Sequence, residues 1–186
     1  FRNGGRSVGR LATASEAVIA MRPAVLATDH ATEPMADDDF ALRPTSAEDF
    51  AAYAKRWTAH RESAAYNAML PQRVRLPVWQ LQAALVDAVR SNQVVVVSGA
   101  TGSGKTTQVG QFILDDALAR GEPVSLVCTQ PRRISAITVA ERVAEERAEP
   151  LGGDGAVGYQ IRLERRASSH TRLLFCTTGI LLRRMQ

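Results

Sequence analysis

The chain contains only two cysteines and no long apolar run among its 186 residues. Cys128 and Cys176 each lie near the end of an apolar segment, so we expect reduced core thiols, as suits an intracellular protein. Two cysteines do not make a disulfide framework, and no cysteine and histidine cluster has the spacing of a zinc site. No apolar stretch is long enough to cross a bilayer. These absences argue against the disulfide-rich, zinc-binding and membrane-spanning classes.

The bulk composition is that of an ordinary globular protein. Hydrophobic residues make up 45% of the chain and charged residues 23%, and the length allows one domain with a real core. The net charge of +4 is mildly basic, which is compatible with a polyanionic partner but does not identify one.

Residues 1–44 show no sustained hydrophobic period, and we expect a disordered leader with at most a short helix near residues 11–21. The first residue is Phe1 rather than Met, and several arginines stand among small residues near it. This pattern weakly resembles an organelle transit peptide, although Glu16 argues against one. The sequence therefore leaves cytoplasm, nucleus and organelle open as compartments.

The octapeptide Gly-Ala-Thr-Gly-Ser-Gly-Lys-Thr at residues 99–106 fits the phosphate-binding loop pattern. A β-branched run, Val94–Val97, precedes it as a buried parallel strand would, and residues 107–120 predict a helix. Lys105 is expected to reach the β- and γ-phosphates, and the Thr106 hydroxyl to bind Mg²⁺. The residues expected to bind the nucleotide are Gly99, Thr101, Gly102, Ser103, Gly104, Lys105, Thr106 and Thr107.

Residues 45–75 predict a helix followed by a connector. Thr45 and Glu48 have the spacing of a capping box, and apolar residues follow at helical spacing to about residue 68. One interpretation is a docking helix whose basic side, with Lys55, Arg56 and Arg61, faces RNA. The other, which we favour, is a helix packed on the core with a solvated charged face. The connector spans residues 72–76.

The remaining chain predicts helices that alternate with apolar strands, which is typical of a parallel α/β sheet flanked by helices. Helices are expected at residues 78–90 and 134–147, and strands at 93–98, 124–128, 157–163 and 172–176. The block Thr129–Ala136, which includes Arg132 and Arg133, follows the second of these strands. The two arginines would lie at the carboxyl edge of the sheet, where ligands bind in open α/β folds and where arginines can hold a phosphate backbone.

Taken together, these segments resemble the DEAH/RHA group of superfamily 2 RNA helicases. The resemblance covers about residues 70–186 and follows the family order. The matching segments are Leu76–Trp79, Gly99–Thr107 (motif I), Thr129–Ala136 (motif Ia), Val157–Arg162 and Thr177–Arg183 (motif Ib). Motif I is generic, whereas the Thr-Gln-Pro-Arg-Arg block is specific to this group. The resemblance implies a partial RecA-like P-loop NTPase domain over residues 76–186, preceded by the helical segment 45–75 and the leader 1–44.

The resemblance also implies roles for individual residues. ATP and Mg²⁺ would bind at the phosphate loop, with Lys105 and Thr106 taking part in the chemistry, and Arg142 would stack on the adenine base. Single-stranded RNA would be held mainly through its backbone. The residues implied along its path are Arg132, Arg133, Thr177, Thr178 and Gly179. The basic residues that could extend this surface are Arg165, Arg166, His170, Arg172, Arg183 and Arg184.

The family's Asp-Glu box, which completes ATP hydrolysis, would come after the last residue, Gln186. We therefore expect this chain alone to bind ATP weakly, without useful hydrolysis or unwinding. Two alternatives stay open: another P-loop enzyme such as a small-molecule kinase or transporter ATPase, and a non-catalytic module that binds RNA, or a protein partner through its helices. The sequence also leaves open DNA instead of RNA as the nucleic acid along which the protein would move.

Overall fold

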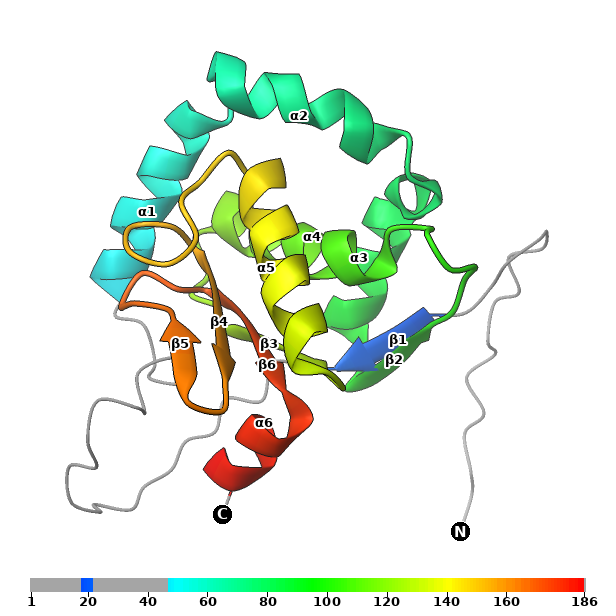
Figure 1. The fold of residues 1–186 in the computed structure, drawn as a ribbon. Coiled ribbons are helices and arrows are strands. Elements are labelled where there is room, and N and C mark those ends of the chain that lie inside the picture. The colour runs from blue at the N-terminus through cyan, green and yellow to red at the C-terminus, as the bar shows by residue number, and fades with distance from the viewer. Residues whose placement is uncertain (1–17, 22–46, 186) are drawn as a thin grey trace, which may run out of the picture.

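The computed structural model describes residues 18–21 and 47–185 (Figure 1). Most of the predicted leader lies outside these residues, and so does the capping residue Thr45 of the segment that follows it. Within them, β1 (Val18–Met21) pairs antiparallel with β2 (Val94–Val97). The short helix expected near residues 11–21 is therefore wrong for residues 18–21, where the β-branched pair Val18 and Ile19 favours a strand.

The main sheet has four strands in the order β3-β6-β4-β5. Its strands are β3 (Leu126–Gln130), β4 (Val157–Ile161), β5 (Glu164–Arg166) and β6 (Leu173–Thr177). The first three in spatial order are parallel, but β5 runs antiparallel to β4. Only Arg162 and Leu163 separate β4 from β5, and such a short connection can join only antiparallel strands. The expected wholly parallel sheet is thus corrected to a mixed one, and β2 pairs with β1 instead of joining it.

The helices lie mainly where the hydrophobic period predicts them. They are α1 (Ala47–His60), α2 (Ala64–Val74), the 3₁₀ helix η2 (Pro77–Leu81), α3 (Gln82–Ser91), α4 (Lys105–Arg120), α5 (Arg133–Glu146) and α6 (Thr178–Arg184). Helices α4 and α5 lie side by side against the main sheet. Gly110 lets α4 lie close to β6, since a Cβ at this position would lie only 3.0 Å from Leu173 Cδ1 of that strand.

The segment between residues 45 and 76 differs from its prediction in two ways. The expected single helix breaks after His60, and Ser63 caps a second helix by accepting a 3.2 Å hydrogen bond from the Tyr66 N–H. The expected connector at 72–76 is largely helical, because α2 continues through Pro71 and buries Arg73.

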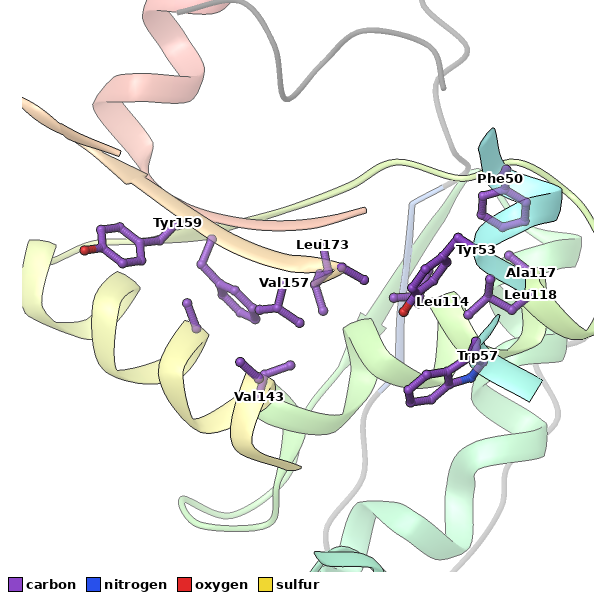
Figure 2. Packing of buried hydrophobic residues seen from close by; sticks show 14 of the residues in the cluster. Phe50, Tyr53, Trp57, Leu114, Ala117, Leu118, Val143, Val157, Tyr159 and Leu173 are labelled. Atoms are coloured by element: carbon purple, nitrogen blue, oxygen red, sulfur yellow. The ribbon is translucent and has the colours of Figure 1, made fainter. Parts of the chain in front are cut away.

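One face of α1 enters the hydrophobic core. Phe50, Tyr53 and Trp57 are all at most 3% exposed and belong to one cluster with Leu114 and Leu118 of α4 (Figure 2). Their spacing of three and four residues places them on one side of the helix. The interpretation of this segment as a core-packed helix is therefore confirmed.

A fully buried arginine joins α1 to the rest of the molecule. The Arg147 guanidinium lies 3.8 Å from the centre of the Trp57 ring and donates hydrogen bonds to Asp115 (2.8 Å), Glu149 (3.1 Å) and the Tyr53 hydroxyl (3.1 Å). Burial alone would lower the pKa of Arg147, but Tyr53 and the two carboxylates raise it above its usual value. The charged form is therefore the one that this site stabilises.

We predict that Trp57→Ala lowers the free energy of unfolding by about 3–5 kcal/mol, because it removes a buried aromatic ring and uncovers Arg147. Denaturant titration of the chain measures this change. Lys55→Ala, an exposed change on the same helix, is the control and should shift stability by less than about 0.5 kcal/mol. Equal small effects of the two substitutions would show that α1 does not contribute to the core.

Candidate functional site

Residues 99–106 follow β2 and run into the first turn of α4. We call this segment the phosphate loop after its sequence pattern, and it depends on glycine for its shape. Gly102 and Gly104 have φ angles of +81° and +91°, a region that side chains rarely adopt. A Cβ on Gly104 would also lie only 2.9 Å from Leu76 Cδ1. Gly104 is therefore required both by the turn and by the close packing beneath it.

The segment before α3 braces this loop. The Val78 N–H donates a 3.1 Å hydrogen bond to the Ser103 carbonyl, and the Val78 side chain is buried in a small cluster with Val86 and Phe112. The backbone hydrogen bond of Val78 and the apolar side chains of Leu76 and Val78 thus contact the same part of the loop, Ser103 and Gly104. The Leu76–Trp79 segment, which the sequence shows only as a family resemblance, has this structural role.

The Lys105 ammonium group lies inside the loop. It donates to the carbonyl oxygens of Gly99 (2.6 Å) and Ala100 (2.8 Å) and to the Ser103 hydroxyl (3.1 Å). These three contacts hold a positive charge among the backbone groups of the loop. An anion entering there would meet a cation that can exchange these neutral acceptors for stronger charged ones.

The beginning of α4 has the features of an anion-binding helix end. Its N-cap is Gly104, and no side chain caps the first turn, so the first-turn N–H groups and the helix dipole can act on an anion. Thr106 is exposed there. Thr107 differs, because its hydroxyl donates to the Gly104 carbonyl and accepts from Gln108 Nε2 at 2.9 Å.

The residues of motifs Ia and Ib meet at the carboxyl edge of the main sheet. Gln130 at the end of β3 is the register partner of Thr177 at the end of β6. Helix α5 begins at Arg133 and α6 at Thr178, just beyond these strand ends (Figure 1). The residues that are exposed at this edge are Arg132, Arg133, Thr178 and Gly179. The topology therefore brings together two segments that are more than forty residues apart in the sequence.

Arg172 does not belong to a basic surface, which corrects the sequence-based expectation. It is 1% exposed, it donates to the carbonyls of Ser169 (2.7 Å) and Thr171 (3.2 Å), and burial lowers its pKa. Both Arg172 and His170 also precede β6, so they lie toward the amino edge, opposite Arg132 and Arg133.

Arg142 is half-buried on α5, and acceptors on two helices hold it. Its Nε donates to Glu146 Oε1 at 2.9 Å, and its two terminal nitrogens donate to Glu145 Oε2 (3.1 Å) and Gln72 Oε1 (3.0 Å). Arg142 is therefore not a freely solvated surface arginine.

A buried polar network lies behind the phosphate loop, and sequence reasoning missed it. Glu146 is 2% exposed, and its Oε2 accepts from the side-chain amides of Gln108 (2.6 Å) and Gln111 (2.8 Å). Gln108 in turn accepts a 3.0 Å bond from Arg73 Nε. In the sequence, only two features indicate this network: the four-residue spacing of Arg142 and Glu146, and the two glutamines in the helix after the loop.

Comparison with known proteins gives relatives that are named as ATP-dependent helicases. No family model matches the chain. ATP-dependent RNA helicase DHX29 of Mus musculus is 45% identical over 161 residues, which are 82% of this chain and 12% of the relative. DExH-box ATP-dependent RNA helicase DExH1 of Arabidopsis thaliana is 55% identical over 115 residues, 61% of this chain and 11% of the relative. ATP-dependent DNA/RNA helicase DHX36 of Mus musculus is 52% identical over 124 residues, 65% of this chain and 12% of the relative.

The chain matches between 10% and 14% of the length of such relatives. No helix in the described part of the chain is long and apolar enough to span a membrane. The phosphate loop, the arginine-bearing carboxyl edge and these identities agree with the resemblance carried by motifs I, Ia and Ib. The chain belongs to the DEAH/RHA group of DExH-box ATP-dependent RNA helicases.

Proposed function

We propose that this chain is the first part of a RecA-like domain that binds ATP with Mg²⁺ at residues 99–107 and single-stranded RNA at the carboxyl edge of the main sheet. The observation that carries the proposal is the Lys105 ammonium inside a glycine loop at the uncapped start of α4. The longer protein would couple ATP hydrolysis to displacement of a paired strand, as the names of the relatives suggest.

The phosphates of ATP would take the place of the acceptors that now hold Lys105. The ammonium charge and the first-turn N–H groups of α4 favour an anion at this point. Gly102 and Gly104 keep side chains away from the backbone that would contact the phosphates. The brace from Val78 to Ser103 limits movement of the loop, which favours binding without a large ordering cost.

Mg²⁺ fits this site with one protein ligand, the Thr106 hydroxyl. Among the described residues, no group of three or more histidines, cysteines or carboxylates could hold a metal ion. The remaining ligands would be phosphate oxygens and water, the arrangement that Mg²⁺ commonly adopts with nucleotides. The chemistry that Mg²⁺ would supply at this site is neutralisation of the phosphate charge, which would favour transfer of the terminal phosphate to water.

Arg142 is proposed to contact the adenine base. Its terminal nitrogens and Nε are engaged by acceptors, and such bonds lie near the plane of the guanidinium. The flat face of the group is therefore the part that can stack on an aromatic ring. This arrangement supports a role for Arg142 beyond that of a surface charge.

RNA is proposed to lie along Arg132, Arg133 and the start of α6. The exposed arginines suit phosphate oxygens, and Gly179 leaves room for a close approach, since a Cβ there would meet no atom within 4 Å. Contacts of this kind position a backbone without reading its sequence.

Replacement of Lys105 tests the nucleotide site. We expect Lys105→Ala to weaken ATP binding by about 10- to 100-fold, because a charge-assisted contact to phosphate is lost. Titration calorimetry of the chain with ATP and Mg²⁺ measures the affinity. Lys55, the only other lysine, provides the matched control, and Lys55→Ala should leave the affinity unchanged. Equal affinities of all three proteins would refute the proposed site.

The salt dependence of binding tests the RNA edge. We expect the pair Arg132→Ala and Arg133→Ala to weaken binding of a single-stranded oligonucleotide and to reduce the slope of log K against log salt by about 1.4, or about 0.7 per lost phosphate contact. Fluorescence anisotropy at several salt concentrations gives the slope. The control is Arg56→Ala, on α1, with Arg61→Ala, in the turn that follows α1. A reduced slope in that control pair alone would place RNA on α1 instead.

A further inference from the structure

Glu145 and Glu146 contact the same arginine but differ in their surroundings. The Glu145 side chain is 60% exposed, whereas that of Glu146 is 2% exposed. An exposed ion pair contributes little because water screens it. A buried carboxylate is costly unless its oxygens are satisfied, and once satisfied it has a fixed position. The third acceptor, Gln72 of α2, is also exposed. Glu146 is therefore the one buried contact, and it can define where Arg142 lies.

Both oxygens of Glu146 are engaged, and they face different helices. Oε1 accepts from Arg142 Nε at 2.9 Å, within α5. Oε2 accepts from Gln108 and Gln111 at 2.6 and 2.8 Å, both on α4. The Glu146 carboxylate thus links Arg142 of α5 to the side chains of Gln108 and Gln111 on α4.

The α4 end of this connection is close to the phosphate loop. The Gln108 backbone N–H donates to the Gly104 carbonyl at 2.8 Å, and its side chain also donates to the hydroxyl of Thr107. A short chain of hydrogen bonds therefore leads from Gly104, through Gln108 and Glu146, to the guanidinium of Arg142. Gly104 takes part through its backbone, and Gln108 and Glu146 are buried, so the links that lead to Arg142 have fixed positions.

From this geometry we propose that Glu146 is a positioning residue for nucleotide binding, which rests on the ATP site proposed above. It holds Arg142 at a fixed place relative to the phosphate loop, so that the arginine meets the base of a nucleotide whose phosphates lie in that loop. Glu146 itself touches neither phosphate nor base. Its effect is on affinity for the complete nucleotide and not on affinity for the phosphates alone.

The test compares ATP with inorganic tripolyphosphate, both with Mg²⁺, by titration calorimetry of the 186-residue chain. Glu146→Gln keeps the size of the side chain but replaces one acceptor with a donor, and all three groups facing it are donors. We expect ATP binding to weaken about tenfold and tripolyphosphate binding to stay unchanged. Glu141→Gln, an exposed change five residues earlier on α5, should alter neither affinity.

Two further variants separate positioning from folding. If Glu146 acts through Arg142, the double variant Arg142→Gln with Glu146→Gln should bind ATP no more weakly than Arg142→Gln alone. Gln111→Met removes one of the two donors that orient Glu146, together with the 2.8 Å bond from Gln111 Nε2 to the Thr107 carbonyl, whereas Gln111 Oε1 has no partner among the described residues that the change would orphan. It should give a smaller loss for ATP only, and it provides the test if Glu146→Gln does not fold.

Equal losses for ATP and tripolyphosphate in Glu146→Gln would overturn the inference, because Glu146 would then act through the shape of the loop. No loss for either probe would overturn it as well. Failure of the ATP site itself has a different signature. In that case the unaltered chain would bind tripolyphosphate no better than Lys105→Ala does.

Discussion

The hydrogen bonds that Glu146 accepts from Gln108 and Gln111 are the constraint on which the rest of this structure depends. They join α4, which begins at the phosphate loop, to α5, which begins at the arginines of the sheet edge. A carboxylate at 2% exposure is stable only with such partners. Through them the two helices that carry the proposed ATP and RNA contacts have one fixed relative position.

The segment before the phosphate loop belongs to the same packed body. Arg73 of α2 contacts Gln108, and Arg147 contacts Trp57 and Tyr53 of α1. Each guanidinium is fully buried, so removal of its partners would leave an uncompensated charge. The helices of residues 47–74 therefore stabilise the loop-bearing core, while the domain boundary after residue 75 remains a prediction.

Local patterns predicted the elements near the loop, and tertiary contacts decided the rest. The positions of the strand, loop and helix around Gly99–Thr106 were predictable because their signal is contiguous. The expectation of a buried parallel strand at Val94–Val97 was wrong, because β2 pairs antiparallel with β1 and leaves Val94 and Val96 exposed. Strand β3 lies two residues later than expected, and β5 (Glu164–Arg166) was missed because its three polar residues show no apolar alternation. Burial of Arg172 and the bond between Gln108 and Glu146, 38 residues apart, depend on packing that no single-segment pattern contains. Edge residues such as Arg132 were placed correctly because parallel strands end together.

The central claim is that the fixed relative position of α4 and α5 determines where both the phosphates and the base of a nucleotide bind. A crystal structure of the chain with a non-hydrolysable ATP analogue and Mg²⁺ tests this most directly. The account predicts phosphates on the N–H groups of residues 102–106, the base against the flat face of Arg142, and Glu146 still bonded to Arg142, Gln108 and Gln111. Phosphates bound elsewhere, or a base directed away from an Arg142 that has left Glu146, would contradict it.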